Sequence, residues 1–135
     1  MSDKSIVVAG RKVALGQSCN IKLKVSATYS GDPVNLRIKV WRAPKPGPTV
    51  LITAAIHGDE INGTGIIHDL MFGEKMKLQS GTLILIPVIN IFGFENHERY
   101  LPDRRDLNRS FPGAENGSLT SRLAYSLMND VVASR

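Results

Sequence analysis

The feature that most constrains the fold is a pair of uninterrupted apolar runs with a helical segment between them. The runs cover Val50–Ile56 and Thr82–Val88, and neither alternates between apolar and polar residues. Strands that are covered on both faces have this composition. The intervening segment, Ile61–Phe72, carries apolar residues near one helix face. Strand, helix and strand in this order predict a βαβ unit with a right-handed crossover.

The first 43 residues are typical of antiparallel β structure instead. Ile21–Tyr29 and Asn35–Ala43 alternate apolar with polar residues, and a turn signal separates them, so we expect them to pair as a hairpin. Ile6–Leu15 is expected to form one strand with a bend at Gly10. A proline-rich connector, Pro44–Pro48, then leads into the βαβ unit.

The remaining segments predict a long loop followed by a helix. Ile89–Gly117 is rich in Asn, Arg, Asp, Pro and Gly, and so long a loop in a compact domain is usually functional. Leu119–Val132 has the pattern of an amphipathic helix, with Ser118 or Thr120 as its N-cap. We therefore expect an α/β fold, a mixed twisted sheet flanked by helices in three layers. Because such a sheet normally continues after this helix, the chain is expected to form the first portion of a larger domain.

Composition limits the classes of partner. The net charge of +5 permits nucleic-acid binding, but the lysines and arginines of the expected strands often stand at alternate positions, as on a solvated sheet face. Aromatic residues make up only 6%, with no pattern for stacking bases, so we expect no nucleic-acid partner. One cysteine, no apolar signal core and no membrane-spanning run predict a soluble, cytoplasmic protein without a membrane contact.

A His-x-x-Glu pair follows the first apolar run directly. His57 and Glu60 carry an imidazole nitrogen and a carboxylate oxygen, and two histidines with one glutamate form a common catalytic zinc site. Gly58 is expected to let the backbone turn tightly, so that both side chains converge on one ion. Nickel or cobalt would bind the same ligands. The pair supplies two ligands, and a third has to come from elsewhere.

Arginine and asparagine side chains are concentrated in the long loop. Arg99, Arg105, Asn108 and Arg109 lie there. Arginine and asparagine together can hold a carboxylate through charge-assisted hydrogen bonds, and an arginine near a metal can polarise a carbonyl and stabilise an oxyanion. The two segments together predict metal-assisted hydrolysis of an amide in a small substrate that carries a carboxylate.

Four motifs in this order carry a resemblance to a known family. They are His57-Gly-Asp-Glu60, Asn90, Arg99-Tyr-Leu101 and the run Asp106–Gly113. With this order and spacing the chain from Val50 onward resembles the succinylglutamate desuccinylase/aspartoacylase family, a branch of the zinc carboxypeptidase-like fold. The resemblance implies that residues 49–135 form the N-terminal portion of a zinc-hydrolase catalytic domain. Residues 1–43 would then be an N-terminal β extension or accessory strands.

The resemblance also implies roles for particular residues. His57 and Glu60 would bind Zn²⁺, and Arg99 would polarise the substrate carbonyl during attack by water. Asn108 and Arg109 would hold the substrate carboxylate, with Arg105 as a possible further contact. Arg105 and Asp106 would brace the loop. The acyl group, acetyl, succinyl or another, is left open.

The family's third zinc ligand, a histidine, and its general base, a glutamate, are expected downstream of residue 135. His68 is expected on a helix surface, whereas His97 lies in the loop and is a weaker alternative ligand. Asp59 is either a partner of His57 or a helix cap. The chain alone is therefore expected to bind zinc weakly and to be inactive. An unpaired sheet edge is expected to cause self-association into a homo-oligomer.

Two other functions remain open. A truncated, non-catalytic chain would keep the fold and the partner surfaces but lack the chemistry, which the missing third ligand and base favour. A basic nucleic-acid-binding module is allowed by the charge alone.

Overall fold

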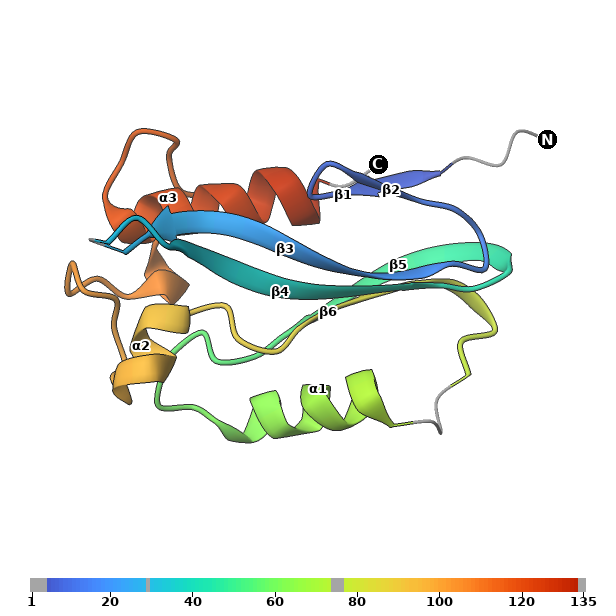
Figure 1. Cartoon of the computed structure of the whole chain (residues 1–135), viewed down its shortest axis with the longest axis horizontal. Helices are drawn as coiled ribbons and strands as arrows, with labels where there is room; N and C mark the ends of the chain where they lie inside the picture. Colours follow the sequence, from blue (N-terminus) through green and yellow to red (C-terminus); the bar gives the residue numbers. More distant parts are fainter. Residues whose placement is uncertain (1–4, 29, 74–76, 134–135) are drawn as a thin grey trace.

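The computed structural model describes residues 5–28, 30–73 and 77–133. Six strands, three α-helices, a short 3₁₀ turn and a final π-helical segment follow one another along these residues. Four of the strands form one mixed sheet in the order β3-β4-β6-β5, and the other two form a separate two-stranded sheet. Helix α1 covers one face of the larger sheet and α3 lies over the opposite face (Figure 1). The predicted fold class, a mixed sheet flanked by helices, is confirmed. In chain order the elements are β1 (Ile6–Val8), β2 (Arg11–Val13), β3 (Ser18–Ala27), β4 (Pro33–Arg42), β5 (Lys45–Thr53), α1 (Asn62–Phe72), β6 (Ser80–Ile86), α2 (Ile91–Asn96), the 3₁₀ turn η1 (Leu107–Arg109), α3 (Leu119–Ser126) and the π-helical segment η2 (Leu127–Val132).

The predicted βαβ unit is present. Strand β5 pairs in parallel with β6, and α1 connects the two strands. Strand β6 is buried on both faces, as its composition predicts. Leu83 and Leu85 pack with Ile67 of α1, whereas Ile84 and Ile86 belong to the cluster on the α3 side.

The predicted hairpin of the N-terminal part is also present. Strands β3 and β4 pair antiparallel, with Ile21 opposite Ile38, and their apolar side chains join the core on the α3 side. Strand β4 in turn pairs antiparallel with β6, which makes the sheet mixed. The sheet thus runs across the boundary between residues 1–43 and 49–135, and the division into these two parts stays a prediction. Tyr29, the expected last residue of the first hairpin strand, lies outside the described residues.

Two strand predictions need correction. The expected single strand Ile6–Leu15 is a hairpin, because Ala9 and Gly10 both have positive φ, 47° and 77°, and form a tight turn between β1 and β2. The expected connector Pro44–Pro48 lies mostly within β5. Among the described residues β5 has a neighbouring strand on one side only, so its prolines interrupt no hydrogen bond on the other side there.

The position of β5 differs from expectation in a further way. The run Val50–Ile56 was expected to be covered on both faces, but the strand ends at Thr53 and most of its residues are exposed. Val50 and Ile52 are 49% and 37% exposed. Composition predicted a buried strand, and within the described part of the chain the strand stands last in the sheet order.

The long loop contains more structure than predicted, since α2 and η1 lie within Ile89–Gly117. The helix after it begins as expected, because the Ser118 side chain accepts a hydrogen bond from the Ser121 N–H. Asp103 ties the loop to this helix by accepting hydrogen bonds from the Thr120 N–H at 3.0 Å and from the Thr120 hydroxyl. Within the described ranges, every helix is too short or too polar to cross a lipid bilayer.

Candidate active site

The backbone after β5 brings His57 into the interior. Ala55 adopts a left-handed conformation with φ of 54°, which turns the chain away from the sheet at the end of the strand. Its carbonyl accepts a hydrogen bond from the Asn90 N–H at 3.1 Å, so the segment after β6 holds the turn. The expected turn residue, Gly58, has another role. A Cβ there would overlap the carbonyl carbon of Gly93 and the carbonyl oxygen of Glu98.

His57 lies between two carboxylates and is only 5% exposed. Its Nδ1 is 2.8 Å from Oε1 of Glu60, and its Nε2 is 2.8 Å from Oδ1 of Asp106. The structure thus brings the predicted pair together and adds a third residue, 49 positions further along the chain. Asp59 is exposed and does not provide the partner of His57, and α1 begins without a side-chain cap.

The two carboxylates set the electrostatics of the imidazole. Burial by itself would lower the pKa of His57, but the hydrogen bonds to Glu60 and Asp106, together with their negative charges, outweigh it and raise that pKa. Burial would conversely raise the pKa of Asp106, and the bonds from His57 and from the Asn108 N–H outweigh it and lower that pKa. Both ring nitrogens donate when the ring is protonated, and one donor is lost when it is neutral.

Asp106 has a larger part in the site than the sequence predicted. Besides His57, it accepts a hydrogen bond from the Asn108 N–H at 2.9 Å and so caps η1. Its Oδ2 is 3.7 Å from Arg99 and 3.9 Å from Arg109. The expected bracing of the loop is therefore only part of its role. The second ring N–H of a metal-binding histidine usually donates a hydrogen bond to a carboxylate. This general rule could have indicated from the sequence that an aspartate contacts His57.

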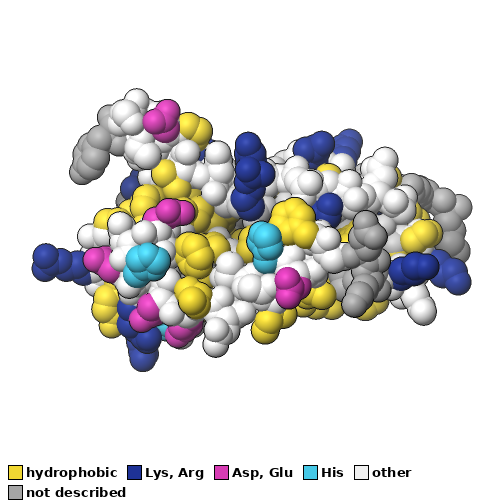
Figure 2. All heavy atoms as spheres, turned by 60° about the horizontal axis from the view of Figure 1, so that its bottom comes forward, with side chains coloured by type: hydrophobic (Ala, Val, Ile, Leu, Met, Phe, Trp, Pro, Cys, Tyr) yellow, Lys and Arg dark blue, Asp and Glu magenta, His cyan; other side chains and the backbone are white. Residues whose placement is uncertain are grey.

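The predicted catalytic and substrate-binding residues differ in how closely they contact His57, Glu60 and Asp106. Arg99 is half-exposed, and its guanidinium lies 4.0 Å from Oε1 of Glu60. The Arg109 side chain is 83% exposed, and Asn108 is exposed as well. Arg105 is exposed, and its backbone, through the N–H to Asp103, takes part in the loop. Figure 2 shows acidic, basic and histidine side chains gathered at the end of the molecule that carries α2 in Figure 1.

Asn90 connects the segments that carry His57 and Arg99. It is fully buried, and its amide donates to the carbonyls of Ile56 at 3.4 Å and of Arg99 at 3.2 Å. Its Oδ1 accepts the Gly93 N–H at 2.9 Å. One side chain therefore links the residue before His57, the start of α2 and the residue expected to polarise the substrate. From the sequence, Asn90 was predicted only as one of the motif residues, without a role of its own.

The donors of His57 and Glu60 suit a zinc ion after a small movement. Two ligand atoms on one tetrahedral zinc stand about 3.3 Å apart, so the pair, now hydrogen-bonded, would separate by about 0.5 Å. Among the described residues no group of three or more histidine, cysteine or carboxylate side chains is arranged to hold a metal ion. His68 is exposed on α1 as predicted, and His97 is exposed at the end of α2. The pair therefore fits as part of a zinc site.

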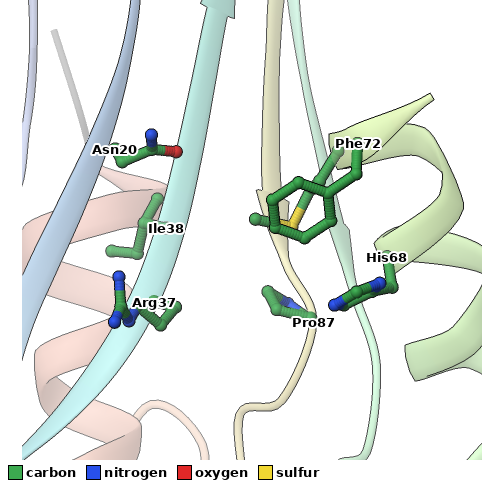
Figure 3. Close-up of a pocket in the computed structure, with 7 residues that line it drawn as sticks. Asn20, Arg37, Ile38, His68, Phe72 and Pro87 are labelled. Atoms are coloured by element: carbon green, nitrogen blue, oxygen red, sulfur yellow. The ribbon is translucent and has the colours of Figure 1, made fainter. Parts of the chain in front are cut away.

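The surface beside Glu60 is hollowed. An open depression of about 360 Å³ is lined by Glu60, Asp59 and the first residues of α1. A second hollow of about 290 Å³ lies on the flank of α1 that faces β4, where Phe72 and His68 point toward it (Figure 3). Of these two hollows, the depression beside Glu60 is the one lined by a residue that contacts His57.

A comparison with known protein families identifies the domain. The sequence model of the succinylglutamate desuccinylase/aspartoacylase catalytic domain matches residues 46–132. The chain belongs to this family. The N-alpha-acetyl-L-2,4-diaminobutyric acid deacetylase of Halomonas elongata is 37% identical over 79 residues, which cover 58% of this chain and 23% of that protein.

Solved structures of the family share the fold. The product-bound ectoine utilization protein EutE of Ruegeria pomeroyi superposes with a TM-score of 0.72 at 30% identity, over 85% of this chain and 36% of that one. The succinylglutamate desuccinylase/aspartoacylase of Rhodobacter sphaeroides gives 0.70 at 33% identity, over 84% and 35%. The chain thus spans about a quarter of the curated relative and about a third of each of these two structures.

Proposed function

We propose that this chain provides part of the zinc site and the carboxylate-binding residues of a hydrolase that cleaves an amide bond in an N-acyl amino acid or a similar carboxylate-bearing substrate. The observation that carries the proposal is the buried His57, held between Glu60 and Asp106 in a chain of the desuccinylase/aspartoacylase family. The names of the relatives, a deacetylase and a desuccinylase, support a deacylase. The single cysteine fits a cytoplasmic location.

Three residues would hold and orient the metal. His57 through Nδ1 and Glu60 through Oε1 would be ligands, while Asp106 keeps the proton on Nε2 and thereby directs the Nδ1 lone pair toward Glu60. A bound zinc ion supplies a Lewis acid for the amide carbonyl and for the attacking water. A third ligand and a general base would come from outside these described residues, since His68 and His97 lie on the surface.

The arginines would handle the negative charges of the substrate. Arg99 stands beside both carboxylates and is half-exposed, so its guanidinium can donate to the carbonyl oxygen as negative charge develops there. Arg109 is exposed, and among the described residues its one ion pair is a 3.9 Å contact with Asp106, which leaves its donors available for a carboxylate. Asn108 next to it supplies amide donors of the same kind.

Metal binding tests the proposal directly. Zinc affinity of the purified chain would be measured by competition with a chromophoric chelator. We expect weak binding that His57→Ala abolishes and His97→Ala, a change of an exposed histidine, leaves unchanged. Equal zinc affinity of the wild type and His57→Ala would contradict the proposed ligand.

Substrate binding and turnover provide the second test. We expect an N-acetyl or N-succinyl amino acid to bind in ligand-observed NMR, with weaker binding in Arg109→Ala and unchanged binding in Arg122→Ala, an exposed arginine of α3. Binding that both variants weaken equally would contradict the assigned carboxylate site. We expect this chain alone not to hydrolyse the substrate. Hydrolysis by the wild-type chain that is lost in Arg99→Ala would contradict this expectation.

A non-catalytic role is the second candidate. It is favoured by the absence of a set of three metal ligands among the described residues. Zinc-independent folding together with no detectable zinc binding would support this role over the first.

A further inference from the structure

The buried amide of Asn90 is bonded to two backbone segments that differ in their other support. Its Nδ2 donates to the carbonyls of Ile56 and Arg99, and its Oδ1 accepts the Gly93 N–H. The side chain is fully buried, so protein groups and not water are its partners. Because donors and acceptor are both engaged, the orientation of the amide is fixed. What each hydrogen bond controls depends on what else holds the two carbonyls.

The segment that leads into His57 is held independently of this amide. The Ala54 N–H donates to the Ile86 carbonyl at 3.2 Å, and the Ala54 carbonyl accepts the Ile89 N–H at 3.1 Å. Each nitrogen of the His57 imidazole lies 2.8 Å from a carboxylate oxygen. The bond from the amide to the Ile56 carbonyl is long, at 3.4 Å. Its loss would therefore leave His57 close to its present position.

The backbone of Arg99 depends much more on the amide. Within residues 5–28, 30–73 and 77–133, hydrogen bonds reach the Arg99 backbone only at its carbonyl. One comes from Asn90 at 3.2 Å, and the other comes from the Gly58 N–H at 3.4 Å, near the limit for a hydrogen bond. Asn90 thus makes the shorter of the two bonds that place Arg99 against the rest of the site.

The Arg99 side chain has no strong anchor of its own in this part of the chain. Its guanidinium is 3.7 Å from Oδ2 of Asp106 and 4.0 Å from Oε1 of Glu60, and it lies 5.7 Å from the centre of the Tyr100 ring. The side chain is 46% exposed, and ion pairs that are this long and this exposed are weak. Long side chains also have many rotamers to choose from. The position of the guanidinium therefore depends on where the backbone places the residue.

We propose that Asn90 is a positioning residue for Arg99. Its amide holds the Arg99 carbonyl and so keeps the guanidinium beside Glu60 and Asp106. His57, in contrast, is held by other groups. Because the amide is buried and engaged with protein groups, Asn90 contacts neither substrate nor metal. The proposal rests on the proposed function only for what Arg99 does to a carbonyl, since the placement of Arg99 can be measured without zinc or substrate.

Substitution by serine separates this role from helix capping. Asn90 is the N-cap of α2, and serine is an equally good N-cap, but its side chain is too short to reach the two carbonyls as well. Asn90→Ser therefore keeps the cap and removes both donated bonds. Asn90→Asp is a second variant, which keeps the shape and the acceptor. The matched control is Asn96→Ser, which removes an amide donor to the Phe92 carbonyl within the same helix.

NMR of the purified chain measures the effect through the arginine Nε–Hε signals. In both Asn90 variants the Arg99 signal should move toward that of Arg122, an exposed arginine of α3, whereas the His57 ring signals should stay in place. Asn96→Ser should move neither. An unchanged Arg99 signal in a folded Asn90 variant would overturn the proposal, and so would a shift of the His57 signals as large as that of Arg99.

Hydrogen exchange in the wild type provides a measurement that needs no variant. The side-chain amide protons of Asn90 should exchange about tenfold or more slowly than those of Asn96, which is exposed. Equal exchange rates for the two side chains would overturn the proposal even if neither Asn90 variant folds.

A double-mutant cycle connects the placement of Arg99 to ligand binding. Asn90→Ser should weaken the binding of an N-acetyl amino acid about threefold to tenfold, and it should weaken binding no further once Arg99 is replaced by alanine. The same loss in the Arg99→Ala background would overturn the proposal. If Arg99→Ala itself leaves binding unchanged, the proposed role of Arg99 fails instead, and the NMR signals still decide whether Asn90 places it.

Discussion

Gly58 and Gly65 offer a test of how the strand end and α2 are held together, because one substitution should have opposite effects at the two positions. A Cβ at Gly58 would overlap the carbonyl carbon of Gly93 and the carbonyl oxygen of Glu98. These are backbone atoms, so no side-chain rotation relieves the overlap. Gly58→Ala should therefore destabilise the fold by about 1–3 kcal/mol, the usual cost of overpacking. A Cβ at Gly65, inside α1, would meet nothing within 4 Å. Gly65→Ala should stabilise the fold by about 0.5–1 kcal/mol through helix propensity.

Thermal unfolding measures the difference. For a chain of 135 residues, 1 kcal/mol corresponds to about 3–4 °C in Tm. The two variants should thus differ by about 5–16 °C, with the wild type between them. All three proteins have to be compared in the same buffer and at one protein concentration. A Tm of Gly58→Ala equal to or above that of the wild type would refute the packing argument. A lowered Tm of Gly65→Ala would show that the outer face of α1 is not free.

Three further predictions follow from single contacts. Asp106→Asn keeps the shape but removes the charge beside Nε2 of His57, and should weaken zinc binding about 10–100-fold in chelator competition; an unchanged affinity would contradict its orienting role. Asp103 accepts two hydrogen bonds from Thr120, and these lower its pKa although burial opposes them. Its stabilisation should therefore be complete above the ordinary value of 3.8 and be lost as the pH falls through the lower folded value. The urea stability difference between wild type and Asp103→Asn, about 1 kcal/mol at pH 7, should shrink over that range, and a constant difference would contradict the assignment. Asn90→Ala leaves several buried backbone groups without their hydrogen-bond partner and should lower the free energy of unfolding in urea by about 2–4 kcal/mol. A decrease below about 1 kcal/mol would mean that water replaces the amide.

Local patterns in the sequence were sufficient for the parts of the fold that depend on neighbouring residues. The alternation in β3 and β4 predicted their pairing, and the apolar run of β6 predicted burial on both faces. His57 and Glu60 are three positions apart, so a turn after a strand was enough to predict their convergence. Each of these inferences uses only residues that are close in the chain.

Contacts between distant segments explain what the sequence did not predict. Asp106 reaches His57 across 49 positions, and this depends on the path that α2 and η1 take through the loop. Gly58 was read as a turn residue because its packing partner Gly93 is visible only in three dimensions. The composition of β5 resembles that of a buried strand, whereas its exposure follows from its last place in the sheet order of residues 5–28, 30–73 and 77–133.

The site is organised by packing before any ligand arrives. Gly58 and Gly93 allow the strand end and α2 to touch through their backbones, and Asn90 adds hydrogen bonds across the same contact. The positions of His57 and Arg99 relative to each other are consequently fixed by buried neutral groups, and the charged side chains need not attract one another to converge. The two carboxylates beside His57 can then each form a hydrogen bond with one nitrogen of the imidazole. A metal ion would replace the proton between His57 and Glu60, while Asp106 would keep its hydrogen bond throughout.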